Sequence, residues 1–194
     1  MKRYVFFIAI VIFFNCLPAA DACVGKILNI GAINSAEGQV FAEILSVIIN
    51  ERTGTTVNTR YYRDSQGLYD AVKARQIDMI IENTTRAMQI LNKPADGDLK
   101  KTYETVKSAY EREKGLVWFK PFGFSNGKNT EGQSYTAPLL RTDVINNFPA
   151  LPRLIGKLGG AVNNEAYAKL MKSVESGEKP KKVARDFLRS KKLI

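Results

Sequence analysis

Within residues 77–91 a strand-like run passes directly into a helical pattern, and this junction limits the possible folds more than any other part of the chain. Residues 77–81 are apolar apart from one aspartate, and so short a β-branched run is typical of a buried parallel strand. The polar residues 82–85 follow, and either Asn83 or Thr84 can cap the helix that comes next. Open α/β sheets bind ligands beyond the carboxyl ends of their strands, so this turn is either a ligand loop or simply a helix cap.

The same alternation recurs through the first two thirds of the chain. Strands are predicted over 26–32, 56–62, 77–81 and 116–122, and helices over 35–54, from the 64–66 turn onward, from 84 to 91 and over 99–113. Strands that alternate with helices predict the α/β class, here with a mostly parallel sheet flanked by helices.

The pattern changes after residue 122. Residues 123–134 are polar and Gly-rich, which predicts a flexible connection. One short strand is predicted over 135–140. The remainder is predicted to be helical, over 142–148, 151–158, 163–174 and 180–190.

The first 22 residues are typical of a secretory signal peptide. Two basic residues precede an apolar run, Tyr4 to Phe14, and Ala20-Asp21-Ala22 fits the small-residue cleavage pattern. The run is too short to span a bilayer comfortably. We therefore predict cleavage near Ala22 and a periplasmic or secreted mature protein. A retained membrane anchor and a lipoprotein acylated at Cys23 are the alternatives.

Composition argues against an enzyme. The 194 residues include no histidine and two cysteines, one of which lies inside the predicted signal. The absence of histidine excludes His-based triads, His general bases and His metal ligands. A single mature thiol excludes Cys-rich zinc sites and an internal disulfide. We predict no catalytic residues, no metal site and no cofactor.

Positive charge is concentrated at the C-terminus of a chain whose formal net charge is +10. The basic residues there are Lys179, Lys181, Lys182, Arg185, Arg189, Lys191 and Lys192. Such a run can bind anionic lipid or nucleic acid, or it can be the solvated face of a helix. No nucleic-acid motif accompanies it, so we predict a solvated face and no nucleic-acid partner.

Several segments resemble the substrate-binding proteins of ABC importers for glycine betaine, choline and related quaternary amines. They are KILNIGAINSAEGQVFAEILSVIINERTG (26–54), LYDAVKARQIDMIIENTTRAM (68–88), YETVKSAYEREKGLVWFKPFGFSN (103–126) and, after a gap, residues 137–188. Together these segments cover most of the chain that follows the predicted signal.

The resemblance implies one lobe of a type II periplasmic binding protein. Family members look two-lobed, with the second lobe inserted where this chain has only residues 123–134. A domain needs at least about 50 residues, which this segment cannot supply. The expected organisation is a signal peptide over 1–22 and a single lobe over 23–194, completed by its C-terminal helices.

The resemblance also implies a set of ligand-binding positions. They are Glu37, Ser65, Gln66, Asn83, Thr84 and Phe122. Some also have a purely structural interpretation: Glu37 suits a first helical turn, and Ser65 and Gln66 suit a turn. Phe122 or Phe124 is expected to line an exposed apolar patch, which usually marks a partner or a ligand groove. Glu82 matches a family glutamate, and we expect it to bond to neighbouring loops rather than to the ligand.

One departure from the family pattern concerns ligand chemistry. The family's E-Y-T-G-T loop is Glu82 to Arg86 here, with Asn83 in place of the tyrosine that helps to cage the ligand. A quaternary ammonium group is held by aromatic faces, each worth about 0.5–2 kcal/mol. The loss of this tyrosine, and an arginine that repels cations if it points inward, are expected to weaken such a cage.

The function implied by the resemblance is that of a periplasmic solute-binding component of an ABC importer. Its partners would be a small polar or quaternary-amine solute and the membrane permease, and a homodimer is one option. The alternative is an interaction or sensory module that kept one lobe of the scaffold and lost transport.

Overall fold

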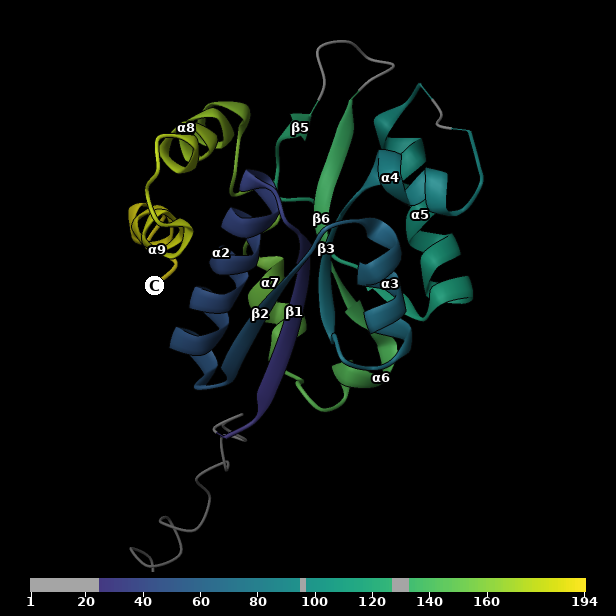
Figure 1. Cartoon of the computed structure of the whole chain (residues 1–194), viewed down its shortest axis with the longest axis horizontal. Helices are drawn as coiled ribbons and strands as arrows, with labels where there is room; N and C mark the ends of the chain where they lie inside the picture. The colour runs from purple at the N-terminus through teal and green to yellow at the C-terminus, as the bar shows by residue number, and fades with distance from the viewer. Residues whose placement is uncertain (1–24, 95–96, 127–132) are drawn as a thin grey trace, which may run out of the picture.

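The computed structural model describes residues 25–94, 97–126 and 133–194, in which a twisted sheet separates two groups of helices (Figure 1). The predicted signal peptide and the middle of the 123–134 connection lie outside these residues. Strand β1 (Ile27–Ile33) pairs in parallel with β2 (Thr56–Tyr62) and β3 (Met79–Asn83). Strand β6 (Ser134–Arg141) pairs antiparallel with β3, with β4 (Leu116–Trp118) and with β5 (Ser125–Asn126).

The helices lie close to their predicted positions. They are α2 (Ala36–Thr53), α3 (Ser65–Lys73), α4 (Thr84–Ile90), α5 (Leu99–Lys114), α6 (Thr142–Ile145), α7 (Leu151–Gly156), α8 (Asn164–Glu175) and α9 (Pro180–Ser190). Helix α2 begins after Ser35 and ends at Gly54, whose φ of 68° is the left-handed conformation that glycine adopts without strain.

The α/β class is confirmed, and the sheet is mixed rather than mostly parallel. Its order is β2-β1-β3-β6-β4, so the parallel strands form one half and β6 returns antiparallel between β3 and β4. The predicted strand over 116–122 is shorter than expected, because β4 ends at Trp118. Beyond it the backbone amides of Phe119 and Phe122 still bond to β6, but Pro121 has no amide hydrogen to continue a ladder.

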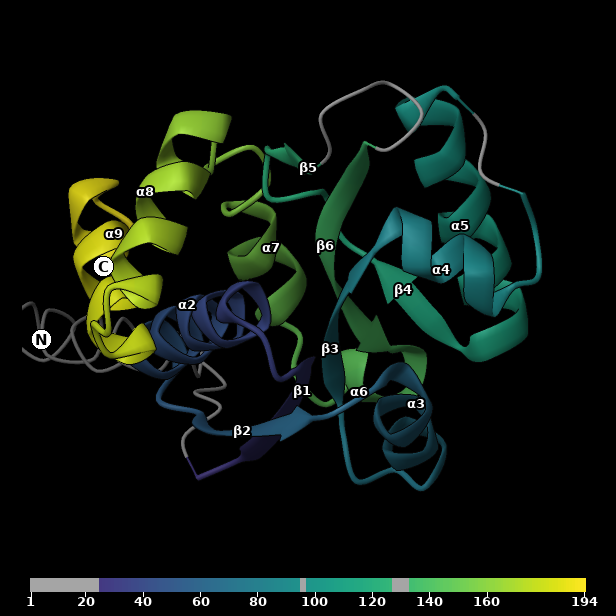
Figure 2. The ribbon, with the colours of Figure 1, turned by 45° about the horizontal axis from the view of Figure 1, so that its top comes forward.

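Figure 2 shows α2, α7, α8 and α9 on one side of the sheet and α3, α4 and α5 on the other. Each side has its own apolar core. The first core contains a stack of aromatic rings, in which the Phe41 centroid lies 4.4 Å from Phe122 and 5.0 Å from Phe124, and Phe124 lies 4.2 Å from Tyr167. The stack ties α2, the segment after β4 and α8 into one layer.

The C-terminal helices α8 and α9 pack against α2, which itself lies on the sheet. Helix α9 buries Val183, Ala184, Phe187 and Leu188. The Nε of Arg52 in α2 donates to the carbonyl of Leu193 at 2.8 Å, which closes the C-terminus over this layer. Within the part of the chain that the structure describes, no helix is both long and apolar enough to cross a membrane.

Candidate functional site

The carboxyl ends of β1 and β3 meet at one edge of the sheet, and both strands run directly into helices there. Because the two strands are parallel neighbours, they bring the starts of α2 and α4 together. A cavity of about 80 Å³ lies between them. Its lining residues are Ile33, Ser35, Glu37, Gly38, Ile81, Asn83 and Arg86. We call it the strand-end cavity.

Two polar residues of this cavity cap the helices beside it. The Ser35 hydroxyl accepts from the Gly38 amide at 3.1 Å, and the Asn83 side-chain oxygen accepts from the Arg86 amide at 2.8 Å. The sequence left Asn83 and Thr84 as alternative caps, and Asn83 fills that role. Thr84 is buried, and its hydroxyl accepts from the Tyr135 amide at 3.1 Å instead of facing the cavity.

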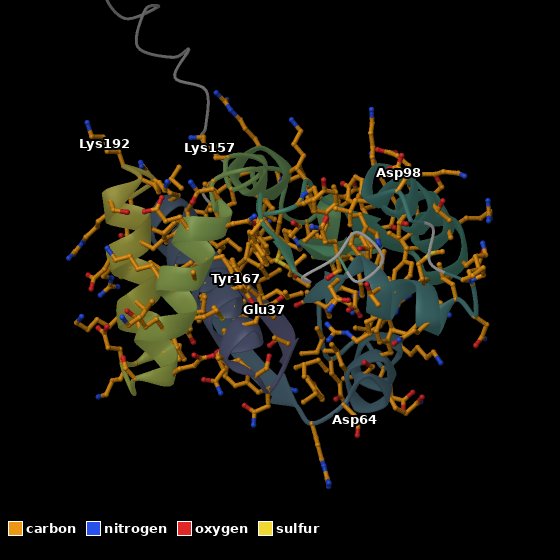
Figure 3. The ribbon with its side chains drawn as sticks, turned by 90° about the horizontal axis from the view of Figure 1, so that it is seen from above. Glu37, Asp64, Asp98, Lys157, Tyr167 and Lys192 are labelled. Atoms are coloured by element: carbon orange, nitrogen blue, oxygen red, sulfur yellow. The ribbon has the colours of Figure 1, made fainter. Side chains whose placement is uncertain are left out.

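Glu37 lines the cavity and also joins three elements. The Thr136 hydroxyl of β6 donates to one of its oxygens at 2.8 Å, and the Tyr167 hydroxyl of α8 donates to the other at 3.0 Å. Figure 3 shows Tyr167 and Glu37 next to each other between α8 and the first turn of α2. The carboxylate therefore fixes the beginning of α2 whether or not it also contacts a solute.

Behind the cavity lies a buried carboxylate, Glu82, with no exposed surface. It accepts from the Tyr69 hydroxyl at 2.8 Å, from the Asn83 amide at 2.8 Å and from Nε of Arg86. Because the one proton of Tyr69 goes to Glu82, the Tyr110 hydroxyl must be the donor in its 2.9 Å contact with Tyr69. Glu82 is thus an internal anchor for Arg86. Its partners come from α3, from the end of β3 and from α4, whereas the sequence predicted bonds to neighbouring loops.

Burial raises the pKa of Glu82, while the charge of Arg86 and the hydrogen bonds oppose the rise. Burial also raises the pKa of Tyr69, and the charge of Glu82 raises it further. Tyr69 therefore stays protonated and acts as a permanent donor to the carboxylate. The arrangement positions a guanidinium group at the cavity.

Replacing Tyr69 with phenylalanine is expected to lower the free energy of unfolding by about 1–3 kcal/mol. The change removes a donor from a fully buried carboxylate and leaves the Tyr110 hydroxyl without its acceptor. Tyr103→Phe is the matched control, because among the described residues the partner of its hydroxyl is the neutral Phe119 carbonyl at 2.9 Å. Urea denaturation checks the difference, and a smaller loss for Tyr69→Phe than for Tyr103→Phe contradicts the anchoring role.

The other predicted site residues lie elsewhere. Ser65 and Gln66 line a second cavity of about 380 Å³ with Tyr69, Ile90, Leu116 and residues of α3 and α5. The side-chain amide of Gln66 is hydrogen-bonded within the chain, since its nitrogen donates to both carboxylate oxygens of Asp70 at 2.9 Å. The expected exposed patch at Phe122 is wrong: Phe122 is fully buried, because its ring stacks on Phe41 of α2.

Sequence reasoning proposed Glu37 and Asn83 for this edge and left out Ser35, Gly38 and Arg86 as site residues. Ser35 carried a usable signal, because a serine immediately before an apolar-periodic helix is a preferred cap. Arg86 also carried a usable signal in the sequence. It follows Glu82 by four residues, which is the spacing of an ion pair on a helix.

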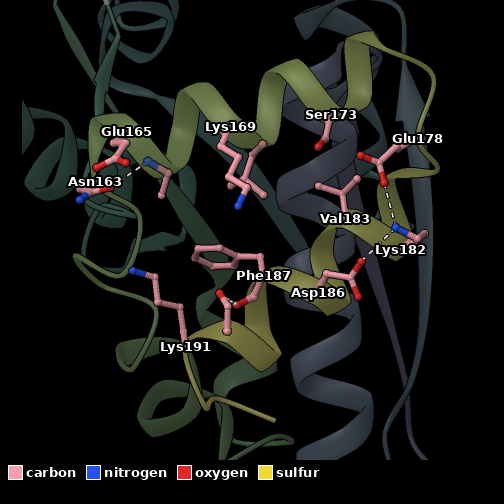
Figure 4. Close-up of a pocket in the computed structure, with 13 residues that line it drawn as sticks. Asn163, Glu165, Lys169, Ser173, Glu178, Lys182, Val183, Asp186, Phe187 and Lys191 are labelled. Atoms are coloured by element: carbon pink, nitrogen blue, oxygen red, sulfur yellow. Dashed lines mark hydrogen bonds and ion pairs between the residues drawn. The ribbon is translucent and has the colours of Figure 1, made fainter.

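A third and larger cavity of about 560 Å³ lies between α8 and α9 (Figure 4). Leu170, Val183 and Phe187 form its apolar part. Lys182 projects at its rim between Glu178 at 2.8 Å and Asp186 at 3.1 Å, so this part of the basic C-terminus is internally paired. In the described ranges, no cluster of three or more histidine, cysteine, aspartate or glutamate residues is arranged to hold a metal ion.

One family model matches the sequence. A family model described as the substrate binding domain of ABC-type glycine betaine transport systems matches residues 26–129. This span contains β1, β3 and every residue that lines the strand-end cavity. None of the curated proteins compared with the sequence matches it.

Solved structures share the fold at low sequence identity. A glycine betaine/carnitine/choline ABC transporter structure gives a TM-score of 0.79 at 12% identity, with 87% of this chain and 98% of that chain covered. Apo YehZ from Escherichia coli gives 0.76 at 12% identity, with 88% and 100% covered. The glycine/betaine/L-proline-binding protein ProX from Borrelia burgdorferi gives 0.51 at 9% identity, with 87% and 95% covered.

Proposed function

We propose that this chain, which belongs to the family of substrate-binding domains of ABC-type glycine betaine transport systems, holds its solute at the strand-end cavity. In this role it delivers a small polar solute to the membrane permease of an importer. Family membership favours this function over an interaction or sensory module that has lost transport.

The observation that carries the proposal is the position of the cavity. It lies beyond the carboxyl ends of two parallel strands, where open α/β sheets bind their ligands. Polar and charged side chains of Ser35, Glu37, Asn83 and Arg86 converge there from two different strand–helix junctions. A small-molecule site is typically a concave pocket in which a few polar groups converge.

The size of the cavity suggests that the site is one-sided. Ligand pockets usually enclose about 300–1,000 Å³, whereas the strand-end cavity holds about 80 Å³. We therefore expect weak solute binding by the isolated chain. A second surface would complete the enclosure, supplied by the permease or by another copy of the chain. Export directed by the predicted signal peptide would place the protein on the outer side of the membrane that holds the permease.

The first test is a thermal-shift screen of the full-length protein with glycine betaine, choline, carnitine, ectoine and amino acids, followed by calorimetry. A solute present at 100 times its Kd stabilises the folded state by about 2.7 kcal/mol, which raises Tm by several degrees. We expect such a shift for at least one solute at millimolar concentration. No shift with any solute would remove the support for a solute receptor.

Two asparagine caps provide a matched pair of variants for locating the site. Asn83 caps α4 at the cavity, and Asn163 caps α8 away from it, each accepting a backbone amide at 2.8 Å. Replacing either with alanine is expected to cost about 0.5–2 kcal/mol of stability. Only Asn83→Ala is expected to weaken solute binding, as calorimetry can show. Equal binding by both variants would place the solute elsewhere.

A further inference from the structure

We infer that strand β2 is an interaction surface for a second copy of this chain. The two β2 strands pair antiparallel about a two-fold axis at Thr59 and join the two sheets into one continuous sheet. The paired surface lies outside the strand-end cavity, so the dimer does not depend on which solute the protein binds.

Strand β2 is the end strand of the sheet, and in the described ranges it pairs with β1 alone. Figure 2 shows it at the opposite end of the sheet from β4. Natural edge strands are usually very short, interrupted by proline or a bulge, or guarded by charged side chains. Strand β2 has seven residues without proline or glycine, and Arg60 is its one charged residue. Such an edge can accept another strand.

The backbone of β2 offers hydrogen-bonding groups on its outer side. The Thr56 amide donates to the Lys26 carbonyl at 2.9 Å, and the Asn34 amide donates to the Tyr62 carbonyl at 2.8 Å, so these two residues of β2 face β1. Backbone groups of successive strand residues point to alternate sides, so every second residue between them points outward. The outward residues are Val57, Thr59 and Tyr61.

Antiparallel pairing centred on Thr59 uses all of these outward groups. Thr59 then faces Thr59 of the second copy, and Val57 faces Tyr61 of the second copy on both sides of the axis. Residues that face each other in this way exchange two N–H···O bonds. No outward amide or carbonyl of Val57, Thr59 or Tyr61 is left over.

The neighbouring registers are less favourable. A centre at Arg60 places two arginines directly opposite each other, and like charges in that position destabilise a sheet. A centre at Asn58 pairs Tyr61 with Thr55, whose carbonyl already accepts from the Asn50 side chain at 3.0 Å. The centre at Thr59 avoids both problems, because it sets Arg60 opposite Asn58.

The side chains on the α2 face both favour and oppose the dimer. Val57 packs against the first core, and the hydroxyls of Thr59 and Tyr61 donate to Glu43 of α2 at 3.3 and 3.2 Å. Tyr61 is 38% exposed, and Val57 of the second copy gives it an aliphatic cross-strand neighbour. The two Glu43 carboxylates lie on this same face and repel each other. Glu43 is partly exposed, so solvent screens the repulsion, and we expect a weak dimer.

The antiparallel arrangement has a consequence for the solute site. Because the strands of the two copies run in opposite directions, their strand-end cavities open at opposite ends of the joined sheet. Neither copy covers the cavity of the other. Under the proposed function, the surface that completes the site therefore comes from the permease.

Sedimentation velocity of the full-length protein over a range of concentrations measures the dimer, and two substitutions of Asn58 test its register. Both substitutions remove the 3.4 Å hydrogen bond from Asn58 to Asn29. Asn58→Glu places a negative charge opposite Arg60 of the second copy, twice in each dimer, and is expected to lower the dimer Kd about three- to tenfold. Asn58→Lys places like charges there and is expected to raise the Kd by a similar factor.

The same two charge changes at Ser108 are the control. This exposed residue lies in α5, which contacts β4 at the other end of the sheet. Charge at Ser108 alters the net charge of the chain equally and is expected to leave the dimer nearly unchanged. A monomer at every concentration would overturn the proposal, as would Asn58 variants that behave like the Ser108 variants.

A second pair of variants tests the backbone bonds at the axis. Thr59→Pro removes an amide hydrogen that points away from β1, a position where an edge strand tolerates proline, and is expected to abolish the dimer. Thr59→Val also loses the hydroxyl bond to Glu43 but keeps the amide, so it is expected to dimerise. Circular dichroism checks that both are folded. A dimer that persists in Thr59→Pro would overturn the pairing, and the Asn58 comparison decides if that variant does not fold.

Discussion

Replacing Arg86 with glutamine is expected to lower the free energy of unfolding by about 3–5 kcal/mol at neutral pH, because it leaves a buried carboxylate without its cation. Glu82 has no exposed surface, and Arg86 is its ion-pair partner. The Tyr69 hydroxyl and the Asn83 amide remain as donors, but neither carries a positive charge. An ionised carboxylate in this position is therefore poorly compensated.

The loss caused by Arg86→Gln is expected to depend on pH in one direction. Burial already raises the pKa of Glu82, and Arg86 is the largest influence that lowers it. Without Arg86 the folded-state pKa of Glu82 rises further above its value in the unfolded chain. A carboxyl group whose pKa is raised by folding stabilises the folded state fully at pH values below its pKa in the unfolded chain. This stabilisation is lost as the pH rises through the pKa of the group in the folded protein. The stability deficit should thus be smallest in mild acid and grow toward neutral pH.

Urea denaturation at pH 5 and pH 7.5, followed by the fluorescence of the buried Trp118, measures this deficit. Arg185→Gln is the control, because its partner Glu51 is at the surface and their contact of 3.1 Å is partly exposed. An exposed pair of this kind is worth at most about 1 kcal/mol. A deficit for Arg86→Gln that is small, or the same at both pH values, would contradict the role of Glu82 as a buried, charged anchor.

The parallel half of the sheet, with the helix that follows each strand, was predictable from local sequence patterns. The parallel strands β1, β2 and β3 are each followed by a helix with a recognisable cap, and β2 and α9 have the predicted bounds. The position of β6 was not predictable in this way. Its eight residues read only as one short strand, and the register that inserts it between β3 and β4 is set by contacts with distant segments.

The site was predictable where it follows from strand ends and not where it depends on packing. Asn83 ends β3, and Glu37 lies in the first turn of the helix that follows β1, so the alternation alone places both at the cavity. Phe122 is apolar and next to a proline, a context that fits a core or a surface equally well. The hydrogen-bond network of Glu82 includes Tyr69 and Tyr110, which come from two other helices, so no local pattern of residues indicated it.

The second large expected effect concerns the close approach of α2 to β1. A Cβ atom at Gly38 would lie 2.0 Å from the carbonyl oxygen of Ile33, which is backbone and cannot rotate away. Gly38→Ala must therefore move the first turn of α2 relative to the end of β1. Because α2 buries most of its length in the first core, we expect a loss of about 3 kcal/mol of stability, at the upper end of overpacking effects.

The same displacement should also damage the site, since Gly38 and Ile33 both line the strand-end cavity and Ser35 caps the helix between them. We expect Gly38→Ala to lose solute binding even at temperatures where it remains folded, which calorimetry and circular dichroism can establish together. Gly156→Ala is the matched control, because a Cβ there meets nothing within 4 Å and alanine favours the helical state of α7. If Gly38→Ala binds and melts like Gly156→Ala, the start of α2 does not lie against β1, and the strand-end cavity loses its rigid wall.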